Sequence, residues 1–211
     1  MPRIKVCGLR DPGNIRGIAS LSPDYLGFIF HPGSVRFIGK DPDRELFSGI
    51  PGKIKKTGVF VDEKIEKVKA TVSRYRLEAV QLHGSESADY CNQIKSQNLI
   101  IIKAFRIGPG FDFNNTLLYN YSCDFFLFDT LSEFPGGSGK KFRWNLLKKQ
   151  RIEKPFFLSG GIGIEDIEVI RNFDHKMLYA IDINSRFEVA PAIKNVELVR
   201  SFIENINNPI L

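Results

Sequence analysis

A cysteine and an aspartate are each the last residue of a short apolar segment. At the end of a strand, their side chains could act on a small molecule. Cys7 ends the run over residues 4–7 and is followed by Gly8, which breaks a strand and can leave the thiol at a rim. A thiolate is a competent base near neutral pH if its pKa falls somewhat below about 8.5. Asp129 ends the run over residues 124–129, and a carboxyl flanked by apolar residues should resist ionisation, as a general acid needs. The two residues therefore predict acid–base chemistry.

Both residues also have a purely structural alternative. Small thiols are common in protein cores, so Cys7 can be a buried strand residue. Asp129 can simply cap the loop that follows its strand. Their shared position favours function, because in a parallel barrel the carboxyl ends of all strands face one rim.

Eight short apolar runs along the chain predict such a barrel. Several are continuous rather than alternating, as expected of strands that are buried on both faces. Amphipathic stretches with helix-start signals separate them, and no linker or repeat divides the chain. We therefore expect a single α/β domain over residues 1–211, a (βα)8 barrel of the TIM type. The runs are residues 4–7, 25–30, 58–61, 79–82, 99–104, 124–129, 155–159 and 178–183, and the expected helices are 11–19, 62–68, 85–90, 165–170 and 195–203, with weaker patterns at 44–48, 114–121 and 144–149.

Composition narrows the class of protein. Hydrophobic residues make up 43% and charged residues 26%, which is ordinary for a soluble globular chain. No apolar run approaches the ~20 residues of a membrane helix, and the first residues lead directly into a strand rather than a signal peptide. The three cysteines have no metal-ligand spacing. These features predict a reduced, cytoplasmic protein without a metal.

The charge balance favours a small anionic partner. The net charge of +6 can attract a phosphorylated or carboxylated substrate. Solvated helix faces are the ordinary alternative. The basic residues are scattered and form no stripe with interleaved aromatics, so we expect no nucleic-acid partner.

Two loops near the end of the chain are candidates for phosphate binding. Gly160 and Gly161 follow the seventh run, and Asn184 and Ser185 follow the eighth. In barrels these two loops often form a phosphate cradle from backbone N–H groups. Paired glycines are more often only a turn, but their place after the seventh of eight strands favours the phosphate site.

Three further residues lie at strand ends or on rim loops. Arg36, in the loop after the second run, can clamp a carboxylate through two parallel hydrogen bonds, although a solvated arginine is the ordinary alternative. His83 ends the fourth run and can bind substrate or be a hydrogen-bonded core residue. Asp182, near the end of the eighth run, can cap backbone groups or equally hold a sugar hydroxyl.

Taken in order, these segments resemble the phosphoribosylanthranilate isomerase family of tryptophan biosynthesis over nearly the whole chain. They include a loop over residues 136–140 that fails the P-loop pattern and is expected to close over a substrate. The matching segments are Lys5-Val6-Cys7-Gly8, Gly27-Phe28-Ile29-Phe30, Ser34-Val35-Arg36, Gly58-Val59-Phe60-Val61, Gln81-Leu82-His83-Gly84, Leu127-Phe128-Asp129, Gly136-Gly137-Ser138-Gly139, Leu158-Ser159-Gly160-Gly161-Ile162 and Ala180-Ile181-Asp182-Ile183-Asn184-Ser185.

The resemblance implies an Amadori rearrangement of N-(5′-phosphoribosyl)anthranilate. In that reaction Asp129 would protonate the ribose ring oxygen, and Cys7 would remove the proton from C2′. Arg36 would hold the anthranilate carboxylate, and the two phosphate loops would hold the phosphate. No metal or redox cofactor is expected, because the substrate's own imine serves as the electron sink.

The chain departs from the family pattern in the loop after the eighth run. The family usually has glycine where this chain has Arg186, and glycine is common at the position of Ala192. Two other functions stay open at this point. One is an isomerase of another phosphoribosylated amine, of the histidine-pathway type, although that family usually places acids at both catalytic positions. The other is a barrel that binds a phosphorylated metabolite without turning it over. Either a monomer or a homodimer is compatible with the sequence.

Overall fold

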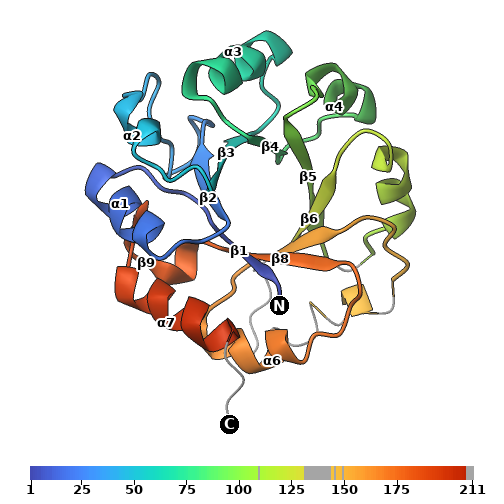
Figure 1. The fold of residues 1–211 in the computed structure, drawn as a ribbon. Coiled ribbons are helices and arrows are strands. Elements are labelled where there is room, and N and C mark those ends of the chain that lie inside the picture. The colour runs from blue at the N-terminus through green and yellow to red at the C-terminus, as the bar shows by residue number, and fades with distance from the viewer. Residues whose placement is uncertain (109, 131–143, 145, 149, 208–211) are drawn as a thin grey trace.

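The computed structural model describes residues 1–108, 110–130, 144, 146–148 and 150–207, and it is a closed barrel of eight parallel strands. Each strand pairs with the next in sequence, and β8 returns to pair with β1 (Figure 1). The barrel predicted from the eight apolar runs is therefore confirmed. The strands are β1 (Arg3–Val6), β2 (Tyr25–Ile29), β3 (Lys55–Phe60), β4 (Ala79–Leu82), β5 (Ile100–Ile107), β6 (Phe125–Thr130), β7 (Phe156–Ser159) and β8 (Leu178–Ile183).

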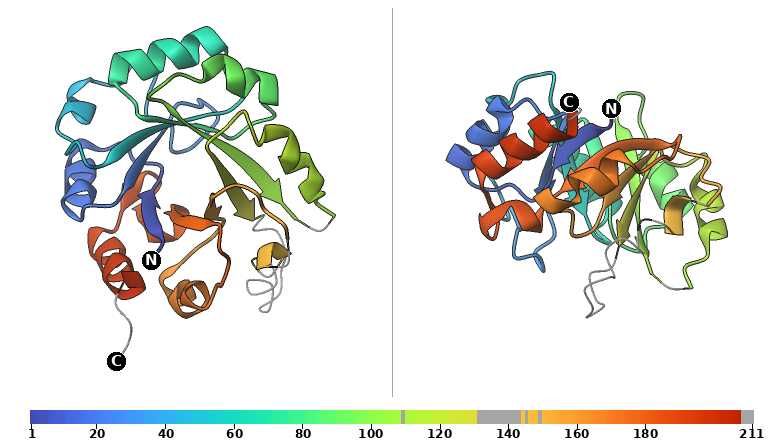
Figure 2. Two further views of the ribbon diagram at one scale, coloured as in Figure 1. Left: turned by 45° about the vertical axis from the view of Figure 1, so that its right-hand side comes forward. Right: turned by 90° about the horizontal axis from the view of Figure 1, so that it is seen from below.

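Helices surround the barrel, as both views in Figure 2 show. The last helix packs between the first helix and α6, so it closes the outer ring. A two-stranded antiparallel hairpin follows β8 and was not predicted from the sequence. The helices are α1 (Pro12–Ser20), α2 (Glu45–Ser48), α3 (Ile65–Tyr75), α4 (Ala88–Ile94), α6 (Ile167–Arg171) and α7 (Val196–Asn207), the 3-10 helices are η1 (Phe113–Tyr119), η2 (Ile164–Asp166) and η3 (Ser185–Phe187), and the hairpin strands are β9 (Glu188–Ala190) and β10 (Ile193–Lys194).

The alternation of side chains along each strand creates two cores. Side chains that point inward form a cluster inside the barrel, including Ala104, Leu127 and Phe157. The alternate residues, such as Phe126 and Phe128, belong to the larger cluster between strands and helices. Successive residues of a strand point to opposite faces, so this phase decides which residues near the strand ends reach the lumen.

Two predicted helix starts are wrong by a few residues. Asp62 does not open a helix, because its backbone is left-handed, with φ of 47°, and α3 begins only at Ile65. The helix predicted to begin at Ser85 begins only at Ala88, as α4, and the Ser87 hydroxyl caps it by accepting from the Tyr90 amide. The start of α1 is as predicted, with the Asp11 carboxylate accepting from the Asn14 amide. The expected loop over residues 136–140 lies outside the described residues, as do parts of 144–149.

Candidate active site

A cavity of about 480 Å³ opens where the carboxyl ends of the strands meet. Every residue predicted from the sequence to belong to the site lines it, from the ends of six strands and the loops that follow them. These residues are Cys7, Arg36, His83, Asp129, Gly160, Gly161, Asp182, Asn184 and Ser185. They lie together because the carboxyl ends of all strands in a parallel barrel face the same rim.

Cys7 stands directly after β1, with its amide still bonded to the Ile183 carbonyl at 3.0 Å. Two glycines make room around it. A Cβ atom on Gly27 would lie 2.7 Å from the Cys7 sulfur, so the neighbouring strand must carry glycine there. Gly8 has φ of 76°, and a Cβ on it would lie 2.7 Å from both the Arg36 side chain and the Asn184 amide oxygen. Glycine is therefore required at positions 8 and 27, because a larger residue would collide with the side chains around the thiol.

The thiol is buried, with the Cys7 residue only 3% exposed. Burial has the largest influence on its pKa and raises it above the ordinary thiol value, because a thiolate loses its hydration there. The charges of Lys5 and Lys194 oppose this shift and lower the pKa of Cys7. Burial therefore makes Cys7 less suited to act as a base. Only Lys5 and Lys194 move its pKa in the direction that a base needs.

Asp129 lies at the end of β6 and points into the cavity toward His83. Its Oδ2 lies 3.2 Å from Nε2 of His83, and the other ring nitrogen of His83 lies 2.7 Å from the Gln81 amide nitrogen. The expected apolar surroundings of Asp129 are wrong, because its side chain is 31% exposed. The flanking Phe128 points to the opposite face of the strand, so apolar neighbours in sequence are not neighbours in space.

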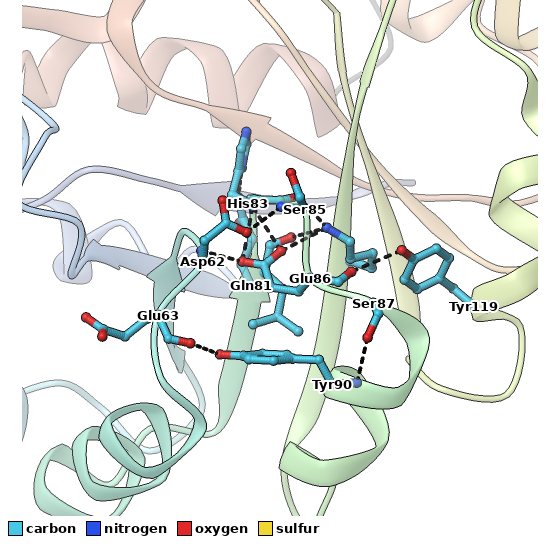
Figure 3. Close-up of polar contacts among 12 residues, drawn as sticks. Asp62, Glu63, Gln81, His83, Ser85, Glu86, Ser87, Tyr90 and Tyr119 are labelled. Atoms are coloured by element: carbon cyan, nitrogen blue, oxygen red, sulfur yellow. Dashed lines mark hydrogen bonds and ion pairs between the residues drawn. The ribbon is translucent and has the colours of Figure 1, made fainter.

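A buried polar network holds the loop that carries His83 (Figure 3). The Lys103 ammonium donates to the Gly84 carbonyl at 2.7 Å and to the Glu86 carboxylate at 3.0 Å. Glu86 in turn accepts from the amides of Gly84 and Asp62. The turn after β4 is therefore tied to β5 and to the loop after β3. Both buried charges are paired and hydrogen-bonded, so they lock His83 in position.

Arg36 is not a solvated surface residue. Its Nε and Nη2 donate to the two carboxylate oxygens of Glu188, at 2.8 and 2.7 Å. Burial would raise the pKa of Glu188, but the hydrogen bonds from Arg36 and Lys194 hold it below its ordinary range. Lys194 also donates to the Asn184 side chain at 2.8 Å. A chain of hydrogen bonds thus joins the predicted carboxylate clamp to one predicted phosphate loop.

The two loops predicted to bind phosphate flank the cavity. Gly160 and Gly161 both have left-handed backbones, with φ of 99° and 64°, which favours glycine. Ser185 opens the short helix η3 on the other loop. The Asn184 amide oxygen accepts from Lys194 at 2.8 Å, which fixes the orientation of this side chain beside the cavity.

Similarity to known proteins extends over the whole barrel. The sequence pattern of the family described as N-(5′-phosphoribosyl)anthranilate (PRA) isomerase matches residues 4–205. The isomerase of Parabacteroides distasonis is 43% identical over 98% of this chain and 94% of its own length. The chain belongs to the phosphoribosylanthranilate isomerase family. Its function is that of the family, the isomerisation of N-(5′-phosphoribosyl)anthranilate in tryptophan biosynthesis, and it is therefore an enzyme.

Solved structures agree with this assignment to the isomerase family. The phosphoribosylanthranilate isomerase of Thermotoga maritima superposes with a TM-score of 0.85 at 32% identity, covering 98% of each chain. A second isomerase structure, in complex with reduced 1-(o-carboxyphenylamino)-1-deoxyribulose 5-phosphate, has a TM-score of 0.81 at 28% identity and also covers 98% of each chain. Neither the histidine-pathway alternative nor a binding protein without turnover is needed to explain these matches.

The departure from the family at Arg186 has a structural explanation. Nη2 of Arg186 forms an ion pair with Glu165 at 2.5 Å, and both side chains are about half exposed. Arg186 is not among the residues that line the described cavity. The pair instead links the loop after β8 to the loop after β7. Exposed pairs of this kind contribute about 0–1 kcal/mol, so the isomerase fold does not depend on it.

Five residues that line the candidate site or lie next to it were missed in the sequence. Lys5 and Lys194 are fully buried ammonium groups, and Glu188 joins Lys194 to Arg36. Gln81 is buried beside His83, and its Oε1 has no hydrogen-bond partner among the described residues. Arg106 adds a positive charge at the end of β5. The inward phase of each strand could have indicated Lys5, Gln81 and Arg106, but nothing local indicated Glu188 or Lys194.

The described part of the chain was also searched for metal-binding and membrane features. Within it, no three or more His, Cys, Asp or Glu side chains are grouped so that they could hold a metal ion. None of the helices described has the length and apolar character needed to cross a bilayer.

Proposed function

We propose that Cys7 is the general base and Asp129 the general acid of the isomerisation. The observation that carries this proposal is that both side chains line one cavity, together with Arg36 and the two predicted phosphate loops. The substrate has a carboxylate at one end and a phosphate at the other. A cavity lined by a guanidinium and by two loops with backbone N–H groups offers partners for both ends of such a molecule.

The acid acts first in this proposal. Asp129, in its protonated form, gives its proton to the ribose ring oxygen, and the bond from that oxygen to C1′ breaks. The anthranilate nitrogen then forms a cationic imine with C1′. His83, at 3.2 Å from Asp129, fixes the carboxyl group in one orientation against the ring oxygen.

The base acts second. The thiolate of Cys7 removes the proton from C2′, the C–H electron pair forms a C1′–C2′ double bond, and the imine electrons return to nitrogen. The positive imine makes this proton acidic, so a modest base is enough. The resulting enol becomes the ketone when C1′ takes up a proton and the C2′ hydroxyl loses one. The product is 1-(2-carboxyphenylamino)-1-deoxyribulose 5-phosphate.

The remaining site residues orient the substrate. Glu188 engages Nε and Nη2 of Arg36, so Nη1 can meet the anthranilate carboxylate. Gly160, Gly161, Asn184 and Ser185 would surround the phosphate, and Asp182 and His83 would contact the ribose. The related structure that holds a reduced carboxyphenylamino-deoxyribulose phosphate supports a ligand of this chemistry. A single barrel domain over residues 1–211, acting as a monomer or homodimer, is part of the same proposal.

A growth experiment tests the proposed acid and base. A bacterial strain that requires tryptophan because it lacks this isomerase should grow without tryptophan when it expresses this chain. The double variant Cys7→Ala/Asp129→Asn should not restore growth at the same protein level, as measured by immunoblot. Restored growth with the double variant would contradict the assignment of both residues. A strain that lacks the histidine-pathway isomerase is the matched control, and we expect no rescue of it.

The second prediction concerns the orientation of the substrate. Arg36→Met should raise KM for the anthranilate substrate by about tenfold to a hundredfold, because a charge-assisted hydrogen bond contributes about 1.5–3 kcal/mol. Steady-state kinetics measure this change. An inhibitor that lacks the carboxylate should bind the variant and the original protein equally. If the variant still strongly prefers the carboxylated form, another group makes that contact, and Arg106 would be the first to examine.

A further inference from the structure

Two buried ammonium groups act electrostatically on the Cys7 thiol. The side chains of Lys5, from β1, and Lys194, from β10, are both 0% exposed. Burying a charge costs several kcal/mol even when it is paired, so such residues are uncommon in a core. Neither lysine has a role in the acid–base steps proposed above. Their position near the thiol calls for a separate explanation.

Both lysines are held in place and cannot turn to solvent. The ammonium of Lys5 donates to Asp182 at 2.9 Å across the β1–β8 pairing. The ammonium of Lys194 donates to Glu188 at 2.6 Å and to Asn184 at 2.8 Å. The Lys194 backbone is also bonded in both directions to the side chain of Asn14, at 2.8 Å each. The two amino groups are therefore fixed in position, and the hydrogen bond to Glu188 opposes the lowering of the Lys194 pKa by burial.

The two hydrogen-bonded groups of charges beside Cys7 lack one negative charge, and Asp129 and Arg106, which line the same cavity, add one charge of each sign. Lys5 and Asp182 form one pair, from β1 and β8, and both act on the thiol electrostatically. Lys194, Arg36 and Glu188 form a second group, in which two cations share one carboxylate. With each of these groups ionised, three positive charges face two negative ones. A thiolate at Cys7 makes the cluster neutral, which is the favoured state in a medium of low dielectric.

We propose that Lys5 and Lys194 are positioning residues that stabilise the thiolate form of Cys7 against its burial inside the barrel. The inference deepens the proposed function, since it explains how a buried thiol can serve as the base. The largest effect on its pKa is burial, which raises it, and the charges of Lys5 and Lys194 lower it. When the thiolate takes the C2′ proton, an S–H bond replaces the C2′–H bond. The negative charge of the thiolate and the positive charge of the imine then disappear together.

The test measures ionisation of Cys7 directly, without turnover. The chain has three cysteines, so replacing Cys91 and Cys123 by alanine leaves Cys7 as the single thiol. The rate of its alkylation by iodoacetamide, which can enter through the cavity, is followed against pH by mass spectrometry. Lys194→Gln and Lys5→Gln should each move the midpoint of this profile upward by about one pH unit or more. The acid limb of kcat/KM should move upward by the same amount, with little change in KM.

A third lysine supplies the matched control. Lys103 is also buried and paired with a carboxylate, Glu86, but it faces the helix side of the barrel near Cys91. Lys103→Gln should disturb packing as much as the other two substitutions while leaving the Cys7 midpoint unchanged. Of the three variants, Lys194→Gln is the one most expected to fold, because Glu188 keeps both hydrogen bonds from Arg36. Circular dichroism confirms folding before each titration.

The outcomes separate this inference from the proposed function. If Lys194→Gln folds and its alkylation midpoint equals that of the control, the inference is overturned and the lysine is only structural. If the midpoints move as expected but Cys7→Ala retains turnover, the lysines tune the thiol and the thiol is not the base. A midpoint that moves by the same amount in Lys103→Gln would also overturn the inference, because the shift would then report loosened packing.

Discussion

Cys7→Ala is expected to lower kcat by about a hundredfold or more, with a much smaller change in KM. The variant keeps the cavity, the clamp and both phosphate loops, so the substrate still binds. It lacks the atom that removes the C2′ proton, and water in a narrow cavity is a poor substitute. Rates of product formation under saturating substrate measure this loss.

Cys91→Ala is the matched control for the loss of a cysteine. Cys91 lies on α4, outside the barrel, and is as deeply buried as Cys7. Burial raises the pKa of Cys91 to about 11, so it has little thiolate at neutral pH. We expect kcat of this variant to stay close to the original value. Near-original turnover in Cys7→Ala would show that another group is the base.

Asp129→Asn is expected to have an effect of similar size, about a hundredfold or more on kcat. The amide has the shape of the carboxyl group and can keep the contact with His83, but it cannot give up a proton to the ring oxygen. Ring opening should therefore become the slow step. Single-turnover kinetics should show that the imine forms slowly, whereas in Cys7→Ala it should form and then persist.

The matched control for this change is Asp124, which lies at the opposite end of β6 from Asp129. Asp124 directly precedes β6, and its carboxylate accepts from the Ile101 amide at 2.8 Å, away from the cavity. Asp124→Asn introduces the same chemical change and should leave kcat unaltered. Equal losses in both variants would indicate a general effect on β6 and would remove the support for Asp129 as the acid.

Most of the barrel could be predicted from the sequence because its strands are buried on both faces. Such strands appear as continuous apolar runs, and all eight were found. The limits of β3 and β5 were less well predicted, since β3 begins with two lysines and β5 continues through Arg106. The hairpin of β9 and β10 was missed because strands of three and two residues leave no periodic signal. The reduced, cytoplasmic setting and the lack of a nucleic-acid partner stay predictions.

The sequence by itself determined which residues reach the site, because strand ends in a parallel barrel share one rim. Cys7, Asp129 and the glycine pair after β7 could all be placed by this rule. Only the tertiary structure decided which charged side chains lie beside these residues. The contacts of Lys5 with Asp182 and of Arg36 with Glu188 join residues 177 and 152 positions apart. No local pattern predicts such pairs, since they arise only when the two ends of the chain meet in the closed barrel. The ionisation of the thiol therefore depends on closure of the barrel.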